Sequence, residues 1–212
     1  MTHPQIIAGI DEAGRGPLAG PVVAAAVWLG DASIKGLGDS KALSAKRRAM
    51  LEVEIKAQCR WAVGVVEPDE IDRINIFAAT MRAMTLAMTA LAQDIAPTLA
   101  LIDGNMTPHG RVPEWCWPAR AIVGGDAKEP AISAASIIAK EHRDRIMRQL
   151  AEAHPHYGWE RNAGYGTREH LAALAAHGPC AHHRRSFAPV AQLMLFGLAN
   201  CTPDSHQNLH QT

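Results

Sequence analysis

The sequence is poor in aromatic residues and cysteine, and it carries no excess of charge of either sign. Aromatic side chains make up 5% of its 212 residues, so the core must be built mainly from aliphatic side chains. The 21 basic and 21 acidic residues balance, which removes the basic signature common among proteins that bind nucleic acids. A polyanionic ligand would have to be held by local basic patches or by bound metal ions.

The four cysteines lie far apart, at Cys59, Cys116, Cys180 and Cys201, and form no C-x-x-C pair. This spacing argues against a zinc ribbon or a disulfide framework and favours a reducing compartment. The N-terminus lacks a signal-peptide pattern. The longest apolar run, residues 17–29, is shorter than the ~20 residues that cross a bilayer. We therefore expect a soluble, cytoplasmic protein that is not associated with a membrane.

Short apolar runs alternate with amphipathic stretches along most of the chain. The runs at 6–10, 21–29, 61–66, 98–102 and 119–123 predict strands, and helices are predicted from Ser44, Pro68 and Pro130 and at 167–176 and 190–198. The turn between the first two strands is too short for a crossover helix, so these strands should be antiparallel. The order predicts a single α/β domain over residues 1–200, with a core to about residue 150, a helical part at 151–200 and a disordered tail at 201–212.

Carboxylates follow three of the predicted strands. Asp11 and Glu12 end the first strand, Asp103 ends the fourth, and Asp126 follows the fifth. Strand ends beside glycine turns are where α/β folds collect functional groups, although aspartate is also a common turn residue. Four carboxylates brought together would repel one another, and hard divalent cations such as magnesium or manganese remove that penalty. The pattern predicts a metal site with oxygen ligands, which would supply positive charge for a phosphate.

Two further patterns point to other kinds of site. Residues 14–19 (GRGPLA) match the spacing of a dinucleotide-binding fingerprint, but a strand rather than a helix is predicted to follow. They indicate instead an irregular glycine turn centred on Arg15, whose backbone amides can approach a sugar-phosphate chain closely. Cys180, His182 and His183 form a candidate soft-metal site, although hydrogen-bonded histidines are the default interpretation.

These features resemble the ribonuclease HII family, the type 2 ribonucleases H. The matching blocks are GIDEAGRGP at 9–17, GPVV at 20–23, DSKAL at 39–43, Asn75, LIDGN at 101–105, GGDAK at 124–128, SAASIIAK at 133–140 with Arg143 and Asp144, GYGT at 164–167 and HHRRSF at 182–187. They run in order over nearly the whole chain, from residue 9 to about 190. A linked series of this kind is far more specific than any single motif.

The resemblance implies a ribonuclease-H-like α/β fold: a mixed five-stranded sheet flanked by helices, with a helical C-terminal extension. It implies an endonuclease that hydrolyses the RNA strand of RNA–DNA hybrids and incises on the 5′ side of single ribonucleotides in duplex DNA. The catalytic, metal-binding residues would be Asp11, Glu12, Asp103 and Asp126, holding two Mn²⁺ or Mg²⁺ ions when substrate is bound. One ion would activate water and the other would stabilise the leaving oxygen, giving 5′-phosphate and 3′-hydroxyl ends.

The resemblance also assigns contacts with the substrate. The substrate-binding residues that it implies are Gly14, Arg15, Gly16, Lys41 and Tyr165. The glycine turn would contact the ribonucleotide through its backbone, where the 2′-hydroxyl separates ribose from deoxyribose. The ring of Tyr165 would pack on the neighbouring deoxyribose. Lys41 would contact phosphate, and Arg184 and Arg185 are further candidates for such a contact.

The segment from Gln192 to Phe196 (QLMLF) resembles the peptide by which bacterial replication proteins dock on the sliding clamp, although it is also a plausible apolar face of the last helix. We expect the protein to be a monomer. Two alternatives stay open. One is another two-metal nuclease of the same fold, such as a Holliday-junction resolvase or a DEDD exonuclease, which would lack the glycine turn and the tyrosine. The other is a non-catalytic hybrid-binding protein with one structural cation or none.

Overall fold

The computed structural model describes residues 5–38 and 43–199, with side chains up to residue 195. Lys41 and the tail at 201–212 lie outside the described residues. The strands are β1 (Ile7–Ala13), β2 (Val22–Trp28), β3 (Arg60–Val66), β4 (Leu99–Asp103) and β5 (Ala119–Ile122). The α-helices are α1 (Ala45–Gln58), α2 (Pro68–Leu91), α3 (Pro130–Ala153), α4 (Trp159–Asn162), α5 (Arg168–His177) and α6 (Ala188–Ala199), and the 3-10 helices are η1 (Gly125–Ala127) and η2 (Pro155–Tyr157).

The strands form one mixed five-stranded sheet in the order β3-β2-β1-β4-β5, with β1 at its centre. β1 and β2 are antiparallel, as their short connection predicts, and β3 is antiparallel to β2. β4 is parallel to both β1 and β5. Because Ile10 pairs with Ile102, Asp11 and Asp103 each come one residue after the last pair, at the same edge of the sheet.

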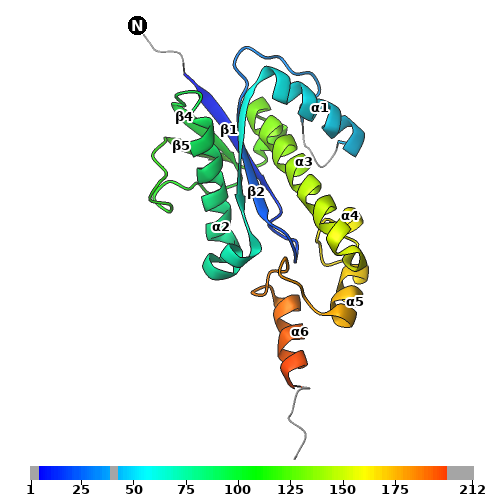
Figure 1. The fold of residues 1–212 in the computed structure, drawn as a ribbon. Coiled ribbons are helices and arrows are strands. Elements are labelled where there is room, and N and C mark those ends of the chain that lie inside the picture. Colours follow the sequence, from blue (N-terminus) through cyan, green and yellow to red (C-terminus); the bar gives the residue numbers. More distant parts are fainter. Residues whose placement is uncertain (1–4, 39–42, 200–212) are drawn as a thin grey trace, which may run out of the picture.

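Helices cover both faces of the sheet (Figure 1). Successive strand residues point to opposite faces, so each face has its own core. One face packs against α2, and this core includes Ile10 and Met84. The other face packs against α1 and α3, and its core includes Ala25, Leu51 and Ile137. The sheet is therefore the middle layer of three, and the end of β1 is enclosed from both sides.

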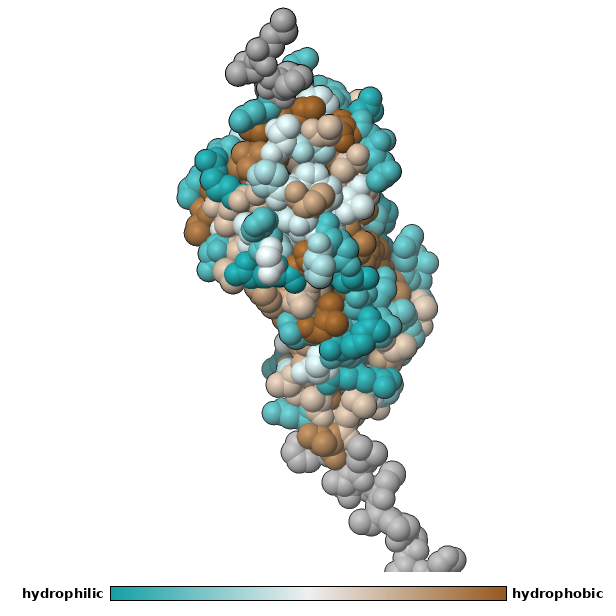
Figure 2. Space-filling view, turned by 90° about the vertical axis from the view of Figure 1, so that its left-hand side faces the viewer, coloured by the Kyte–Doolittle hydropathy of each residue, from teal (hydrophilic) through white to brown (hydrophobic). Residues whose placement is uncertain are grey.

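The helix α2 is long and apolar enough to cross a membrane by length and composition. In this fold, 50% of its most apolar stretch is buried, and Met84 and Met88 pack in the core. The side of the molecule on which α2 lies in Figure 1 shows hydrophilic residues interspersed among hydrophobic ones (Figure 2). Packing against the sheet accounts for the apolar composition of α2.

The helix α2 is interrupted at Asn75, which the sequence pattern did not predict. Asn75 has φ 67° and ψ 163°, a conformation that costs a non-glycine residue about 1–3 kcal/mol. Its side-chain Oδ1 accepts hydrogen bonds from the backbone N–H groups of Phe77 and Ala78, at 3.0 and 3.1 Å. These bonds cap the second part of α2 and offset part of the strain.

The segments after α3 form a third core around the last residues of the glycine turn. This core includes Leu18 and Ala19 from that stretch, Trp159 from α4, and Leu174 from α5. The backbone N–H of Leu18 donates to the carbonyl of Gly164 at 2.8 Å, which joins the turn directly to the loop before α5. The helical C-terminal part is therefore anchored at the end of β1, where the candidate site lies.

Candidate active site

A cavity of about 300 Å³ opens at the C-terminal end of β1. It is lined by carboxylates, by the glycine turn and by one tyrosine, namely Asp11, Glu12, Asp103, Gly14, Arg15, Gly16 and Tyr165. These residues come from β1, the turn after it, β4 and the loop before α5. The structure thus brings together three of the four predicted metal ligands and every predicted substrate-binding residue that it describes.

Asp11 and Glu12 are adjacent, Asp11 is buried and Glu12 is mostly buried, and their negative charges repel each other. Burial raises the pKa of Asp11 well above its ordinary value, the charge of Glu12 raises it further, and a hydrogen bond with Ser136 offsets part of the rise. The charge of Asp103 adds to the same effect. Burial also raises the pKa of Glu12, although Arg15 lowers it through an ion pair at 3.3 Å. The described protein groups leave these charges incompletely neutralised, and a bound cation would compensate for them.

Asp103 and Asp126 occupy neighbouring places at the end of the sheet. Asp103 accepts a hydrogen bond from the backbone N–H of Gly125, at 2.7 Å. An added Cβ at Gly125 would lie 2.6 Å from Cδ1 of Ile132, so a side chain there would displace this methyl group. Asp126 is buried in η1 and lines an adjacent cavity of about 70 Å³ with Ser133. Asp126 therefore follows the residue that contacts Asp103 but is not among the residues that line the carboxylate cavity, and its role as a ligand stays a prediction.

The carboxylates fit a hard divalent cation by their chemistry. Within residues 5–38 and 43–199, no three His, Cys, Asp or Glu side chains lie close enough to hold a metal ion together. However, Glu12 Oε2 is buried without a hydrogen-bond partner, which is costly for a carboxylate oxygen. A cation beside Glu12 would give this oxygen a partner. The oxygen donors of Asp11, Glu12 and Asp103 suit magnesium or manganese.

Arg184 holds the glycine turn from behind the cavity. Its guanidinium donates to the backbone carbonyls of Gly14 at 2.5 Å, Arg15 at 2.9 Å and Gly20 at 3.0 Å. Burial lowers the pKa of Arg184 to about 9, so the group is still a cation at neutral pH. Because the side chain of Arg184 is fully buried, the phosphate contact suggested for it from the sequence is wrong. Its neighbour Arg185 is exposed.

Arg143, from α3, supports the same turn from the other side. Its guanidinium donates to the carbonyls of Pro21, Ala19 and Ala163, at 2.9, 3.0 and 2.9 Å respectively. An added Cβ at Gly14 would lie 2.0 Å from Nε of Arg143, and Gly14 has φ 96°. Only glycine meets both requirements, so the turn depends on this residue.

Tyr165 lies at the open side of the cavity. Its side chain is 50% exposed, and an added Cβ at Gly16 would lie 3.5 Å from Cε1 of its ring. The backbone N–H of Tyr165 donates to the carbonyl of Asn162 at 2.9 Å. The ring therefore lies next to the glycine turn, and half of its surface remains accessible to a ligand.

Besides Arg143, the polar residues Ser136 and Lys140 line the cavity and escaped the sequence interpretation. Ser136 and Lys140 both lie on α3. They are four residues apart on α3, a spacing that places side chains on one face of a helix and could have revealed them. Lys140 forms an ion pair with Asp144, with Nζ 2.5 Å from Oδ1. This pair agrees with a structural role for Asp144, which lies one turn further along α3 from Lys140.

The candidate soft-metal residues are engaged in hydrogen bonds. The backbone N–H of Cys180 donates to Nδ1 of His183 at 3.0 Å, and the Sγ of Cys180 lies 3.4 Å from the same nitrogen. The default interpretation of hydrogen-bonded histidines is confirmed for His183.

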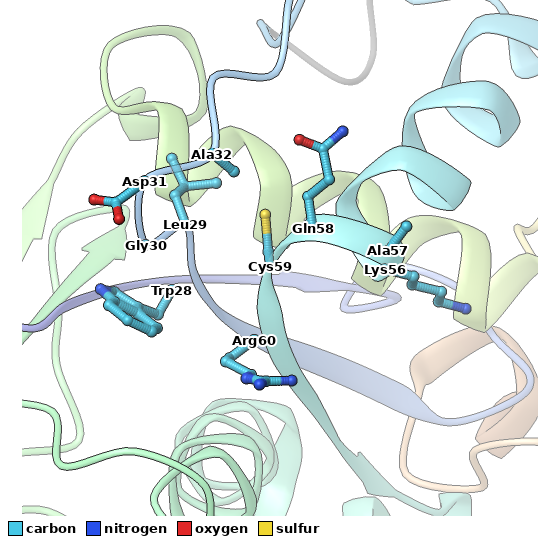
Figure 3. Close-up of a pocket in the computed structure, with 10 residues that line it drawn as sticks. All are labelled: Trp28, Leu29, Gly30, Asp31, Ala32, Lys56, Ala57, Gln58, Cys59 and Arg60. Carbon is cyan, nitrogen blue, oxygen red and sulfur yellow. The ribbon is translucent and has the colours of Figure 1, made fainter.

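A larger cavity, of about 520 Å³, lies at the opposite end of β2, between the end of α1 and the start of β3 (Figure 3). Its polar lining mixes Asp31, Lys56 and Arg60, and the thiol of Cys59 points toward the gap between Ala32 and Gln58. Burial raises the pKa of Cys59, which disfavours a thiolate nucleophile. The cluster of acidic side chains lies instead in the cavity of about 300 Å³ at the end of β1.

Comparison with known proteins decides the family. The sequence profile of ribonuclease HII matches residues 8–190. The chain belongs to the ribonuclease HII family. It is 74% identical over 191 residues to a ribonuclease HII of Novosphingobium aromaticivorans, covering 88% of this chain and 97% of that protein.

Solved structures share the fold over nearly the whole chain. A chain of a PCNA–ribonuclease HII complex from Archaeoglobus fulgidus has a TM-score of 0.71 and 28% identity, covering 89% of this chain and 96% of that one. Bst ribonuclease HIII in complex with Mn²⁺ has a TM-score of 0.72 and 19% identity, and the match covers 91% of this chain and 70% of that one. The ribonuclease-H-like fold is therefore confirmed.

Family membership also decides among the functional interpretations that the sequence left open. The enzyme is a ribonuclease H, an endonucleolytic hydrolase that acts on RNA–DNA hybrids. A resolvase, a DEDD exonuclease and a non-catalytic binding protein are excluded by the same match.

Replacing Asp11 by asparagine tests the electrostatics of the site. The raised pKa means that the ionised carboxylate destabilises the folded metal-free protein at neutral pH, so stability should fall as pH rises through that pKa. In EDTA, D11N should raise the melting temperature by about 2–4 °C for each kcal/mol of relieved repulsion. It should also abolish the stabilisation that Mn²⁺ gives to the wild type, as measured by scanning calorimetry.

The matched control is D144N, which removes an acidic group paired with Lys140 and should leave the Mn²⁺ response intact. A lower melting temperature for D11N in EDTA, together with an unchanged response to Mn²⁺, would contradict this description of the site.

Proposed function

We propose that the enzyme incises duplex DNA on the 5′ side of a single embedded ribonucleotide, as well as cutting the RNA strand of hybrids. The observation that carries the proposal is the shared cavity, in which Asp11, Glu12 and Asp103 face the glycine turn and Tyr165. A phosphodiester held at the carboxylates would place its sugar beside the turn. Such an activity suits an enzyme that starts the removal of ribonucleotides from DNA.

The metal-binding residues would be Asp11, Glu12 and Asp103, with Asp126 approaching from the adjacent cavity. When bound, two Mg²⁺ or Mn²⁺ ions supply a water nucleophile and charge stabilisation for in-line displacement at phosphorus. The Mn²⁺ complex of a ribonuclease HIII with the same fold supports an ion of this kind. Asp11 and Glu12 hold the negative charge that attracts the ions, and no protein nucleophile takes part.

The glycine turn would read the sugar through its backbone. Arg184 and Arg143 hold several of the carbonyls in and after this turn from behind, which leaves its outer edge free to meet the 2′-hydroxyl. Gly14 and Gly16 let a sugar-phosphate chain approach closely because they lack side chains. The exposed ring of Tyr165 would pack on the deoxyribose next to the ribonucleotide. Lys41, outside the described residues, would contact phosphate.

A cleavage assay tests this proposal. With Mg²⁺ or Mn²⁺, we expect a duplex with one ribonucleotide to be cut on its 5′ side, leaving a 3′-hydroxyl and a 5′-phosphate, while an all-DNA duplex stays intact. D103N should lose activity at least about 100-fold, because it removes a metal ligand. Y165A should lose the preference for single ribonucleotides, and the control Y165F, which keeps the ring, should retain it. Equal cutting of the all-DNA duplex would overturn the assignment.

We further propose that α6 docks on a sliding clamp through the segment from Gln192 to Phe196. The helix projects from the body of the molecule at the end away from the N-terminus (Figure 1). Gln192 is exposed, and Leu195 is 67% exposed although it is apolar. The PCNA complex of the archaeal relative supports such a partner.

The double variant Q192A/F196A tests the docking proposal, because it changes one polar and one apolar residue of α6, a helix that contributes no residue to the lining of the carboxylate cavity. We expect it to lose binding to the bacterial clamp in surface plasmon resonance while cleaving hybrids at the wild-type rate. The proposal fails if the variant binds the clamp as tightly as the wild type.

A further inference from the structure

A chain of three hydrogen bonds runs through two buried histidines to the loop that carries Tyr165. The backbone N–H of Cys180 donates to Nδ1 of His183 at 3.0 Å. The Nε2 atoms of His183 and His170 lie 3.0 Å apart, and Nδ1 of His170 lies 2.9 Å from the carbonyl oxygen of Tyr165. Both imidazoles are buried, and we call this chain the histidine relay.

One arrangement of protons satisfies every bond in the histidine relay. The carbonyl of Tyr165 can only accept, so Nδ1 of His170 carries a proton. The indole N–H of Trp159 can only donate, and it lies 3.1 Å from Nε2 of His170, so that nitrogen carries none. The N–H of Cys180 likewise requires an unprotonated Nδ1 on His183, which puts the proton between the two rings on Nε2 of His183. The single lone pair of His170 Nε2 is then shared between this proton and the indole N–H of Trp159. The rings are therefore neutral and adopt opposite tautomers.

The surroundings of the histidine relay favour neutral rings. Burial, together with the neighbouring His170, His154 and His182, lowers the pKa of His183 to about 4. Burial also lowers the pKa of His170. The ring of Tyr157 contacts the ring of His183 edge to face, with centroids 4.6 Å apart. The relay is therefore intact at neutral pH.

The histidine relay joins the two walls of the active-site cavity. At one end, His183 forms a β-bridge with Ala19, and the next residue, Arg184, holds the carbonyls of the glycine turn. At the other end, the ring of Tyr165 lies against Gly16. The relay thus ties the support of the glycine turn to the backbone of Tyr165, from the side facing away from the cavity.

We propose that His170 and His183 are positioning residues that set the place of the Tyr165 ring relative to the glycine turn, and so set the preference for single ribonucleotides. Both imidazoles are buried away from the cavity, so they act through Tyr165 and do not touch substrate. The inference rests on the substrate contact proposed above for Tyr165. Its basis is that the Tyr165 carbonyl receives a directed bond from His170, in addition to the one from the backbone N–H of Thr167 at 2.8 Å.

The test compares H170Q with W159F and Y165A. In H170Q the amide oxygen takes the place of Nε2 and accepts from His183, but the donor to the Tyr165 carbonyl is lost. W159F is the matched control, because it removes the other hydrogen bond to the same nitrogen and leaves the histidine relay complete. The quantity measured is kcat/KM for a single-ribonucleotide duplex divided by kcat/KM for an RNA–DNA hybrid.

We expect H170Q to lower this ratio about three- to tenfold, which is the effect expected from the loss of one neutral hydrogen bond. W159F should leave the ratio unchanged. An unchanged ratio in H170Q, together with a lowered ratio in Y165A, would overturn the positioning role alone. An unchanged ratio in Y165A would overturn the proposed role of Tyr165 and this inference with it. Equal reductions in H170Q and W159F would show a general loss of packing and would also overturn it.

Nitrogen NMR of the wild type gives a second readout that does not depend on activity or on a folded variant. In protein labelled with ¹⁵N-histidine at pH 7, long-range correlations should show a protonated Nδ1 on His170 and a protonated Nε2 on His183. The same tautomer on both rings, or a charged ring, would contradict the histidine relay.

Discussion

The burial of two adjacent carboxylates at the end of the central strand is the constraint on which the rest of the structure depends. Asp11 and Glu12 follow the apolar part of β1, and the layers on both sides of the sheet remove them from water. Arg15 and Ser136 compensate only part of the charge, as the raised pKa values of both carboxylates show. A fold selected for stability alone would avoid this arrangement. Cation binding provides the missing compensation and links the stability of the site to its chemistry.

The glycine turn presents the complementary problem, because it is irregular and its carbonyls lack partners in a sheet or helix. Arg143 and Arg184 provide six hydrogen bonds to backbone carbonyls, and most of these bonds reach the stretch from Gly14 to Pro21. The two guanidinium groups are buried, and each of their nitrogens donates to a backbone carbonyl, which makes this stretch rigid without regular structure. A reader of sugar geometry needs such rigidity, because small displacements weaken discrimination.

Local patterns predicted the local structure well, and long-range contacts escaped them. Ser44 caps α1 as expected, since its side chain accepts from the backbone of Arg47, and the short connection from β1 to β2 correctly indicated antiparallel strands. The mixed sheet was implied by the family resemblance alone, and the strand order was not predicted, because pairing of β1 with β4 joins segments about 90 residues apart. The structural role of Arg184 escaped the sequence for the same reason: its three carbonyl partners lie more than 160 residues away in the sequence.

The most direct test of the central claim is anomalous diffraction from crystals of the wild type soaked in Mn²⁺. The account predicts a manganese peak among the carboxylates of Asp11, Glu12 and Asp103, with Glu12 Oε2 as a ligand. It would be contradicted if saturating Mn²⁺ left no anomalous density there and Glu12 Oε2 stayed buried without a partner.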